Sequence, residues 1–371
     1  MELDQIKLDR ILGEYFCQHY MIDINDYYKI EEIDAKELLV PERIDLIAKL
    51  KYIEYREKGY SLDYIKELYK AHIEAFSNGS YTEPGNDSKN SINKYFDTFN
   101  NLIDNIKQSG LDEKISVIPV GKNNVILDGA HRVAIAAYFN LKLPIIRFEN
   151  LYANYGVEFF KKRLLSEKYI DYLVTEYCKL KDNLYFACIW PEFKGNLQLN
   201  NENVLTDDEF KVFYSKKIKI SYEGLHNLIT QIYSNRESIG DLSDNFERTI
   251  NEFDDSENYL TIHIFECNSF SKILELKANI LTTFKEENYP IHITDNQNEA
   301  IQLANILLNK NSVDFLHQGK PNHYFELQSW SKRKVRNLKH NSRRNLVLLT
   351  RKIGLYRELR IFYNYLRDIV K

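Results

Sequence analysis

Cysteine and long apolar runs are scarce in this chain of 371 residues. The four cysteines are far apart, without the close spacing that zinc ligands or a small disulfide framework require. They are Cys17, Cys178, Cys188 and Cys267. No apolar run approaches the length of about 18 residues that indicates a membrane-spanning helix. The N-terminus also lacks the apolar centre of a signal peptide. We therefore expect a cytoplasmic protein with reduced thiols.

The overall composition is that of a globular protein, with 44% hydrophobic and 28% charged residues. A chain of this length can bury ample core and is expected to form two or three domains. Helical and strand patterns both occur along it, which predicts a mixed α/β or α+β fold.

Residues 125–132, with the sequence Val-Ile-Leu-Asp-Gly-Ala-His-Arg, are the most informative stretch. The apolar residues predict a strand that ends at Asp128, and the Ala-rich run 133–139 predicts a helix after it. A helix start offers free N–H groups and a partial positive charge, and Gly129 lets a ligand approach the backbone closely. These features suit a bound phosphate. The alternative is a buried turn in which Asp128 only caps the helix.

Three further segments surround this octet. Residues 38–43 (Leu-Leu-Val-Pro-Glu-Arg) precede a helical run, and residues 116–121 (Ser-Val-Ile-Pro-Val-Gly) precede the octet. Residues 144–147 (Pro-Ile-Ile-Arg) follow its helix. Together with the octet, this order resembles the ParB/sulfiredoxin-like superfamily over roughly residues 30–150. In that superfamily nucleotide phosphates bind at the Gly-x-x-Arg helix start. The resemblance therefore implies phosphate binding by Gly129, Ala130, His131 and Arg132.

One branch of this superfamily consists of small-molecule kinases with Asp-Gly-His-His-Arg at this point. DNA-partitioning members usually carry Gly-Glu-Arg-Arg instead. The chain has Asp-Gly-Ala-His-Arg, which is nearer to the kinase branch, although Ala130 replaces one histidine. The resemblance then implies ATP or ADP with Mg²⁺ as cofactor, with no metal ligands identified. It also implies phosphoryl transfer to a hydroxyl of a small polyol, sugar or amino acid. No cysteine lies in the turn, which disfavours a sulfiredoxin-type thiol mechanism.

The kinase branch carries a glutamate directly after its Leu-x-Pro segment as general base, and Glu42 occupies that position. A base is needed because a hydroxyl with a pKa far above 7 must lose its proton as it attacks phosphorus. Asp128 would orient this hydroxyl, while His131 and Arg132 would stabilise the transferred phosphoryl group. Arg43 would keep Glu42 ionised or contact phosphate. The alternative for Glu42 is an ordinary helix start, where proline and glutamate are both favoured.

An insertion separates the Pro-Glu segment from residue 116, with more residues than a compact member of the superfamily needs. Two helical patterns, over residues 62–76 and 92–106, flank a polar loop over residues 81–91. Such a loop is either a substrate lid or a solvent-exposed connection between helices. The side chains there that would hydrogen-bond a hydroxylated substrate are Glu83, Asn86, Lys89 and Asn90.

The middle of the chain carries fewer signals. We expect a helix over residues 158–180, strands over residues 183–190 and 216–222, and an acidic loop over residues 236–258. An α/β rhythm follows, which favours a largely parallel or ferredoxin-like sheet. Its expected elements are a strand at 259–266, a helix at 269–286, a strand at 290–294, a helix at 296–308 and a strand at 312–316.

Two polar groups in this region are candidates for ligand binding. His292 and Asp295 lie where a strand ends and a helix starts, a common ligand position in open α/β sheets. The alternative is helix capping, because Asn296 and Glu299 have the spacing of a capping box and Asn309 would end the helix.

The last forty residues are strongly basic. Residues 332–371 contain thirteen Lys and Arg against two acidic residues, so they carry +11 while the remainder carries −15. Apolar residues alternate with the arginines as in an amphipathic helix, which would bind anionic lipid, a partner protein or nucleic acid. Folding back on the acidic remainder is the other possibility. Peripheral attachment to the inner membrane face would suit an enzyme of bacterial surface-polysaccharide synthesis.

The sequence thus predicts four parts. They are a nucleotide-binding domain over residues 1–150, a connecting region over 151–258, a small α/β domain over 259–328 and a basic helical tail over 329–371. The expected function is that of a phosphotransferase. The competing function is that of a nucleotide-gated DNA-binding protein of the ParB type. Asp128, Glu42 and the lack of a recognisable DNA-reading module favour the phosphotransferase.

Overall fold

The computed structural model contains one compact unit over residues 1–317 and a second over residues 318–371. The residues that the structure describes are 5–23, 27–82, 89–111, 117–191, 205, 207–233, 259–284 and 291–318. Several predictions lie outside them, namely Glu83 and Asn86, the acidic loop over residues 236–258 and the basic tail over residues 332–371. The elements of the first unit are mixed helices and strands, which agrees with the predicted α/β or α+β class.

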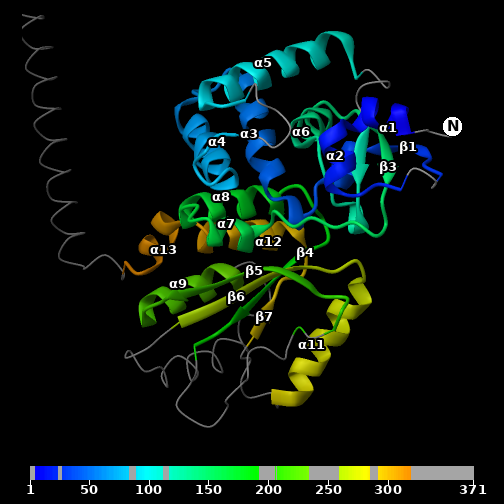
Figure 1. Cartoon of the computed structure of the whole chain (residues 1–371). Coiled ribbons are helices and arrows are strands. Elements are labelled where there is room, and N and C mark those ends of the chain that lie inside the picture. The colour runs from blue at the N-terminus through cyan, green and yellow to red at the C-terminus, as the bar shows by residue number, and fades with distance from the viewer. Residues whose placement is uncertain are drawn as a thin grey trace, which may run out of the picture. The chain divides into compact units, whose positions relative to one another are not determined.

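A three-stranded sheet forms the framework of the N-terminal half (Figure 1). Its strands are β1 (Ile30–Asp34), β2 (Ile118–Val120) and β3 (Lys142–Arg147). The order is β1-β3-β2, with β1 antiparallel and β2 parallel to β3. Helix α6 (Ala130–Tyr138) packs on one face, where Val133 and Ala136 meet Ile145 in the core. Helices α1 (Gln5–Leu12) and α2 (Glu14–His19) bury Leu8 and Phe16 in a separate hydrophobic cluster, which also contains Ile146 of β3.

The strand predicted for residues 125–127 is reduced to a short return of the chain along β2. Ile126 makes a single bridge to Val120, and the Leu127 N–H donates to the Pro119 carbonyl at 2.9 Å. The 3₁₀ turn η3 (Lys122–Asn124) connects the two segments. This tight return places Asp128 directly before Gly129 and the start of α6. The helix predicted after Gly129 is confirmed.

A helical layer adjoins α6 and contains the insertion. Its helices are α3 (Asp45–Glu57), α4 (Asp63–Phe76) and α5 (Ile92–Ser109), and the latter two confirm the predicted helical patterns. In α5 the buried residues Tyr95, Phe99, Ile103 and Ile106 share one face, as a period of 3.6 residues requires. Two 3₁₀ turns, η1 (Ala35–Leu38) and η2 (Pro41–Arg43), lead from β1 into α3.

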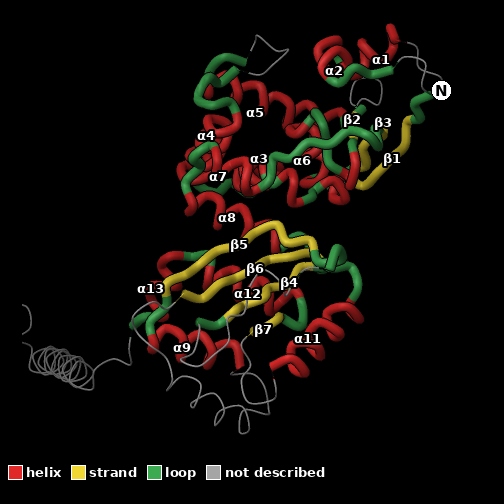
Figure 2. The backbone as a smooth tube through the Cα atoms, turned by 60° about the horizontal axis from the view of Figure 1, so that its bottom comes forward, coloured by secondary structure: helices red, strands yellow, loops and turns green. Residues whose placement is uncertain are grey.

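The second sheet has four strands, which lie side by side in the order β5-β6-β4-β7 (Figure 2). They are β4 (Leu184–Ile189), β5 (Lys211–Lys219), β6 (Tyr259–Glu266) and β7 (Ile291–Ile293). Of the two predicted arrangements, the largely parallel sheet is wrong, because each of the three neighbouring pairs is antiparallel, as they would be in a ferredoxin-like sheet. Strands β6 and β7 do point the same way, but β4 from the preceding region lies between them. The boundary predicted at residue 258 therefore falls inside one sheet.

Helices cover both faces of this sheet. Alternate β4 residues Leu184, Phe186 and Cys188 face the core that includes α8 (Glu167–Cys178) and α12 (Gln297–Leu307). The residues between them face α11 (Phe270–Phe284). Helices α7, α8 and α12 lie between the insertion and the sheet (Figure 1).

Local departures from prediction have local causes. The helix predicted over residues 158–180 is divided into α7 (Val157–Lys162) and α8, with Leu164 in the left-handed region between them. Residues 216–222 contain the end of β5 and the start of α9 (Tyr222–Tyr233). The strand predicted over residues 312–316 is wrong, because this segment forms α13 (Lys310–Leu316).

Asn309 explains the last difference. Its side chain accepts hydrogen bonds from the N–H groups of Asn311 and Ser312, so it caps the start of α13 rather than the end of α12. Within the described residues, no helix is long and apolar enough to cross a membrane.

Candidate functional site

The turn into α6 has the geometry that a close backbone approach requires. Gly129 precedes the helix with φ +82° and ψ +24°, a left-handed conformation that disfavours other residues. A Cβ there would lie 2.5 Å from the Ile118 side chain and 3.0 Å from Nη2 of Arg132. Gly129 occupies the N-cap position, and among the described residues no backbone N–H donates a hydrogen bond to the Asp128 carboxylate. The capping alternative is therefore excluded for Asp128.

Asp128 and Arg132 stand beside this helix start. The Asp128 side chain is 53% exposed, and its Oδ2 lies 3.8 Å from Nη2 of Arg132. Burial lowers the pKa of Arg132, while the Asp128 carboxylate opposes that shift. The first helical backbone bond runs from the Val133 N–H to the Gly129 carbonyl, so the preceding N–H groups point out of the helix end. A partly desolvated guanidinium and these N–H groups form a suitable environment for an anion.

Arg43, in η2, is almost fully buried and contacts the segment that leads into this turn. Its Nε and Nη2 donate to the two carboxylate oxygens of Asp45 at 2.9 and 3.0 Å, and Nη1 donates to the Ile126 carbonyl at 2.5 Å. The guanidinium also lies over the Tyr155 ring. These contacts hold the short return along β2 in place. The predicted contact of Arg43 with phosphate has no support in this geometry.

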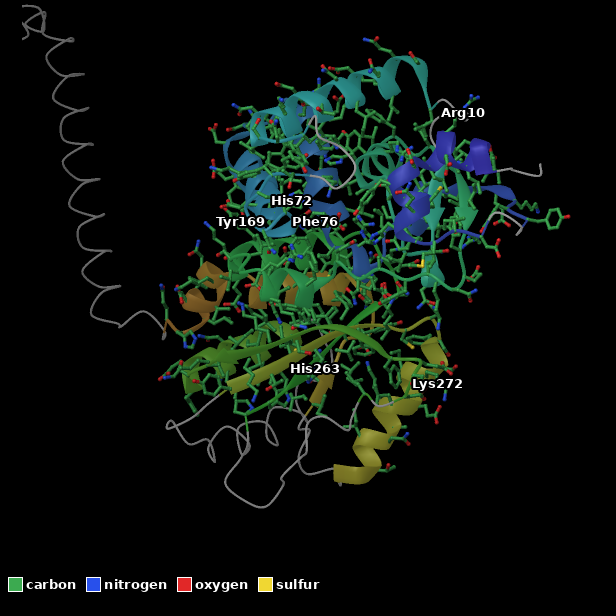
Figure 3. All side chains as sticks on the ribbon, viewed as in Figure 1. Arg10, His72, Phe76, Tyr169, His263 and Lys272 are labelled. Atoms are coloured by element: carbon green, nitrogen blue, oxygen red, sulfur yellow. The ribbon has the colours of Figure 1, made fainter. Side chains whose placement is uncertain are left out.

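Asp45 is the centre of a buried charge network that the sequence analysis missed. Lys49 donates to Oδ2 of Asp45 at 2.9 Å and lies 3.1 Å from Nε2 of His72. Burial alone would raise the pKa of Asp45, but Arg43 and Lys49 hold it well below its usual range. Burial, reinforced by the Lys49 charge, lowers the pKa of His72 to about 3. His72 lies within the helical layer, near Phe76 on the same helix (Figure 3).

His131 faces the insertion. Its Nε2 lies 2.8 Å from the hydroxyl of Tyr69 on α4, and its ring packs edge-on against Phe99 of α5. Burial and the charges of Lys49 and Lys89 lower the pKa of His131 well below its usual value. The imidazole is therefore neutral at pH 7. Lys89, one of the predicted substrate-binding residues of the loop, is therefore close enough to the start of α6 to affect the pKa of His131.

Glu42 does not share these partners. Its side chain is 9% exposed, and both of its oxygens accept from Lys211 of β5, at 2.8 and 2.9 Å. Lys211 also lies 3.6 Å from Glu266, which accepts from the Tyr177 hydroxyl at 2.6 Å. Among the described residues, no hydrogen bond or ion pair joins Glu42 to Asp128. The two carboxylates therefore have different cationic partners, Lys211 for Glu42 and Arg132 for Asp128.

The remaining predicted residues have other roles or surroundings. Asn90 is exposed, and the Lys89 ammonium lies 5.4 Å from the centre of the Tyr95 ring. His292 is buried, with Nδ1 3.1 Å from the Tyr233 hydroxyl and Nε2 3.1 Å from Glu299. Asp295 pairs with Lys277 on α11. His292 and Asp295 are not brought near the α6 turn by any described contact.

The capping alternative is confirmed at the start of α12. The side chain of Asn296 accepts from the Glu299 N–H at 3.1 Å, and Glu299 accepts from the Asp295 N–H at 2.6 Å. Burial alone would raise the pKa of Glu299, but the His292 imidazole 3.1 Å away and the hydrogen bond from the Asp295 N–H lower it.

Three further residues, which no motif in the sequence marks, lie at or near these groups, namely Tyr20, Tyr69 and Lys211. Burial raises the pKa of Tyr20, and Tyr155 and Asp128 add to the shift, so this phenol lies in the neighbourhood of the Asp128 carboxylate. A chain with 27 tyrosines gives no sequence signal for choosing two of them. The Asp45–Lys49 spacing of four residues was the one available signal for the buried network.

The described residues contain no group of three His, Cys, Asp or Glu side chains placed to hold a metal ion. Comparison with protein-family models, curated proteins and solved structures finds no match to this chain.

Proposed function

We propose that this protein is a nucleotide-dependent phosphotransferase whose ParB/sulfiredoxin-like N-terminal part binds phosphate at the start of α6. The observation that carries the proposal is the turn itself. Left-handed Gly129 exposes the helix start, the Arg132 guanidinium folds against it, and the exposed Asp128 carboxylate lies beside it. The nucleotide would be ATP or ADP with Mg²⁺, and the acceptor a hydroxyl of a small polyol, sugar or amino acid.

In this reaction the acceptor oxygen forms a bond to the terminal phosphorus, and the bond from phosphorus to the remaining nucleotide breaks. The hydroxyl proton passes to a carboxylate. Asp128 suits this role better than Glu42, because Asp128 is exposed with one contact of 3.8 Å. Glu42 has both oxygens occupied by Lys211. Arg132 and the helix start would stabilise charge on the transferred group.

The first test is calorimetric titration of the full chain with ATP, ADP and CTP in the presence of Mg²⁺. Arg132→Ala should abolish binding, because it removes the cation at the helix start. Arg147→Ala is the matched control, since Arg147 makes a comparable partly buried ion pair with Glu31 on the sheet. Equal binding by both variants would contradict the site. A preference for CTP would favour the nucleotide-gated DNA-binding alternative.

The second test separates the two carboxylates. The native chain, Asp128→Asn and Glu42→Gln are incubated with the bound nucleotide and a mixture of polyols, sugars and amino acids. Phosphorylated products are then detected by mass spectrometry. We expect Asp128→Asn to lose transfer while it still binds nucleotide. Loss in Glu42→Gln alone would assign the base to Glu42, and absence of any product from the native chain would refute the proposed function.

We also propose that the basic segment 332–371 attaches the protein to an anionic membrane surface. Its net charge of +11 opposes the −15 of the remainder, and each Lys or Arg near an anionic bilayer contributes about 1 kcal/mol. A chain truncated after Gln328 should lose co-sedimentation with phosphatidylserine vesicles, while neutral vesicles should bind neither chain. Equal binding of the truncated chain would refute this attachment.

A further inference from the structure

The insertion between the Pro-Glu segment and β2 supplies a side chain to the helix start. Tyr69 of α4 is fully buried, and its hydroxyl shares a hydrogen bond of 2.8 Å with Nε2 of His131 in the first turn of α6. These residues are 62 positions apart, so the contact depends on how α4 packs in the helical layer. A compact domain without the insertion would lack this partner.

The Tyr69 hydroxyl is held in place from several directions. Its ring packs against the rings of Tyr52, Phe96 and Phe99, with centroids 5.2 to 5.5 Å away. Its backbone carbonyl lies 2.6 Å from Nδ1 of His72, and Nε2 of the same imidazole lies 3.1 Å from the Lys49 ammonium. A tyrosine fixed in this way presents its hydroxyl at one defined point.

His131 is fixed in turn by two elements of the insertion. Tyr69 engages Nε2, and the ring packs edge-on against Phe99, with centroids 4.6 Å apart. The described residues make no hydrogen bond to the other ring nitrogen, Nδ1. Because the nearby cations and burial keep the imidazole neutral, a ligand would meet a hydrogen-bonding nitrogen without a full charge. Nδ1 is the nitrogen left for a phosphate oxygen.

We infer that Tyr69 is a positioning residue for His131, which it orients so that Nδ1 contacts a nucleotide phosphate at the start of α6. This inference rests on the proposed function and extends it. The insertion is then part of the phosphate site through α4. Tyr69 itself touches no reacting atom and acts through the imidazole.

The test uses ¹⁵N spectra of the histidine rings in the full chain, with His131 assigned by its loss in His131→Gln. Tyr69→Phe removes only the hydroxyl. Tyr52→Phe is the matched control, because Tyr52 is equally buried in the same aromatic cluster and its hydroxyl donates to Asn100 instead. We expect Tyr69→Phe to move the Nε2 resonance of His131 and Tyr52→Phe to leave it in place. In the native chain, ADP with Mg²⁺ should move the Nδ1 resonance.

Calorimetry completes the test. Tyr69→Phe should weaken ADP binding on the order of threefold to tenfold, the loss expected for one hydrogen bond, and Tyr52→Phe should change it less than about twofold. If Tyr69→Phe leaves the Nε2 resonance of His131 in place, the inference is wrong. The same holds if Nε2 moves but ADP binds without moving Nδ1, because Tyr69 would then have only a structural role. A native chain that binds no ADP refutes the proposed function first, before any variant is compared.

Discussion

Lys211 donates to both carboxylate oxygens of Glu42, across 169 positions of the chain. Glu42 lies in the 3₁₀ turn η2 and Lys211 lies on β5. Their ion pair therefore connects the N-terminal part to the four-stranded sheet. The residue that the family resemblance implies as general base is therefore a member of a nearly buried ion pair. The chemistry of the Glu42 carboxylate therefore depends on whether Lys211 stays paired with it.

Removal of Lys211 should cost more stability than removal of the whole pair. Lys211→Met leaves the Glu42 carboxylate, itself nearly buried, without its cation, and we expect a loss of about 1 kcal/mol because Lys211 is 37% exposed and partly screened. The double variant Glu42→Gln with Lys211→Met should recover part of that loss. Urea unfolding of the native chain, both single variants and the double variant measures the coupling. Additive losses would contradict a direct interaction.

Gly129→Ala should destabilise the chain and weaken phosphate binding. The left-handed backbone costs a non-glycine residue about 1–2 kcal/mol, and the new Cβ would also press on the Ile118 side chain. Gly59→Ala is the matched control, because Gly59 has φ +66° but no atom within 4 Å of the point that a Cβ would occupy. The difference between the two free energies of unfolding isolates the contact. Equal losses would show that backbone strain is the whole effect.

Asp45→Asn should be among the most damaging single changes. It removes the anion that Arg43 and Lys49 share inside the core, and loss of one partner in a buried pair costs about 3–5 kcal/mol. Asp104→Asn is the control, since Asp104 pairs with Arg56 at a half-exposed position and should cost less than about 1 kcal/mol. Denaturant unfolding compares them. A small loss in Asp45→Asn would mean that the network contributes little to stability.

Stability should fall as the pH falls from about 6.5 towards 3. The pKa of His72 is lowered from 6.5 to about 3 in the folded chain, so below pH 6.5 the unfolded chain binds a proton that the folded chain does not. Above pH 6.5 neither state binds this proton, so His72 does not change the free energy of unfolding. Between pH 6.5 and about 3, that free energy falls by about 1.4 kcal/mol per pH unit. His72→Gln, whose amide oxygen can still accept from Lys49, should show a shallower slope in urea unfolding at pH 4 to 7. An unchanged slope would contradict the neutral state of His72.

Much of the local structure could be predicted from the sequence. The helix after Gly129, the helices α4 and α5 of the insertion and the cap formed by Asn296 follow from residues a few positions apart. Prediction failed where a short segment carried two signals. Residues 312–316 read as a strand by their apolar content, but the cap at Asn309 starts a helix there.

The candidate site shows the same division. The sequence marked Asp128, Gly129 and Arg132 because strand end, glycine and arginine are adjacent in the chain, and the structure places them together. Glu42 was also predicted for this site, and in the structure its carboxylate is held by Lys211 of β5, which no sequence pattern indicated. The partner of a buried charge depends on which distant elements pack around it, and that information is not local.

By itself, the sequence determined the mixed fold class, most of the helices and the conformation-sensitive turn at Gly129, because periodicity, capping and glycine preference act within about one helical turn. The tertiary structure alone decided that β4 lies between β6 and β7, that Tyr69 meets His131 and that Lys211 meets Glu42. The physical reason is burial. Once a polar group leaves water it must find a partner, and the packing of distant helices and strands determines which partner is within reach.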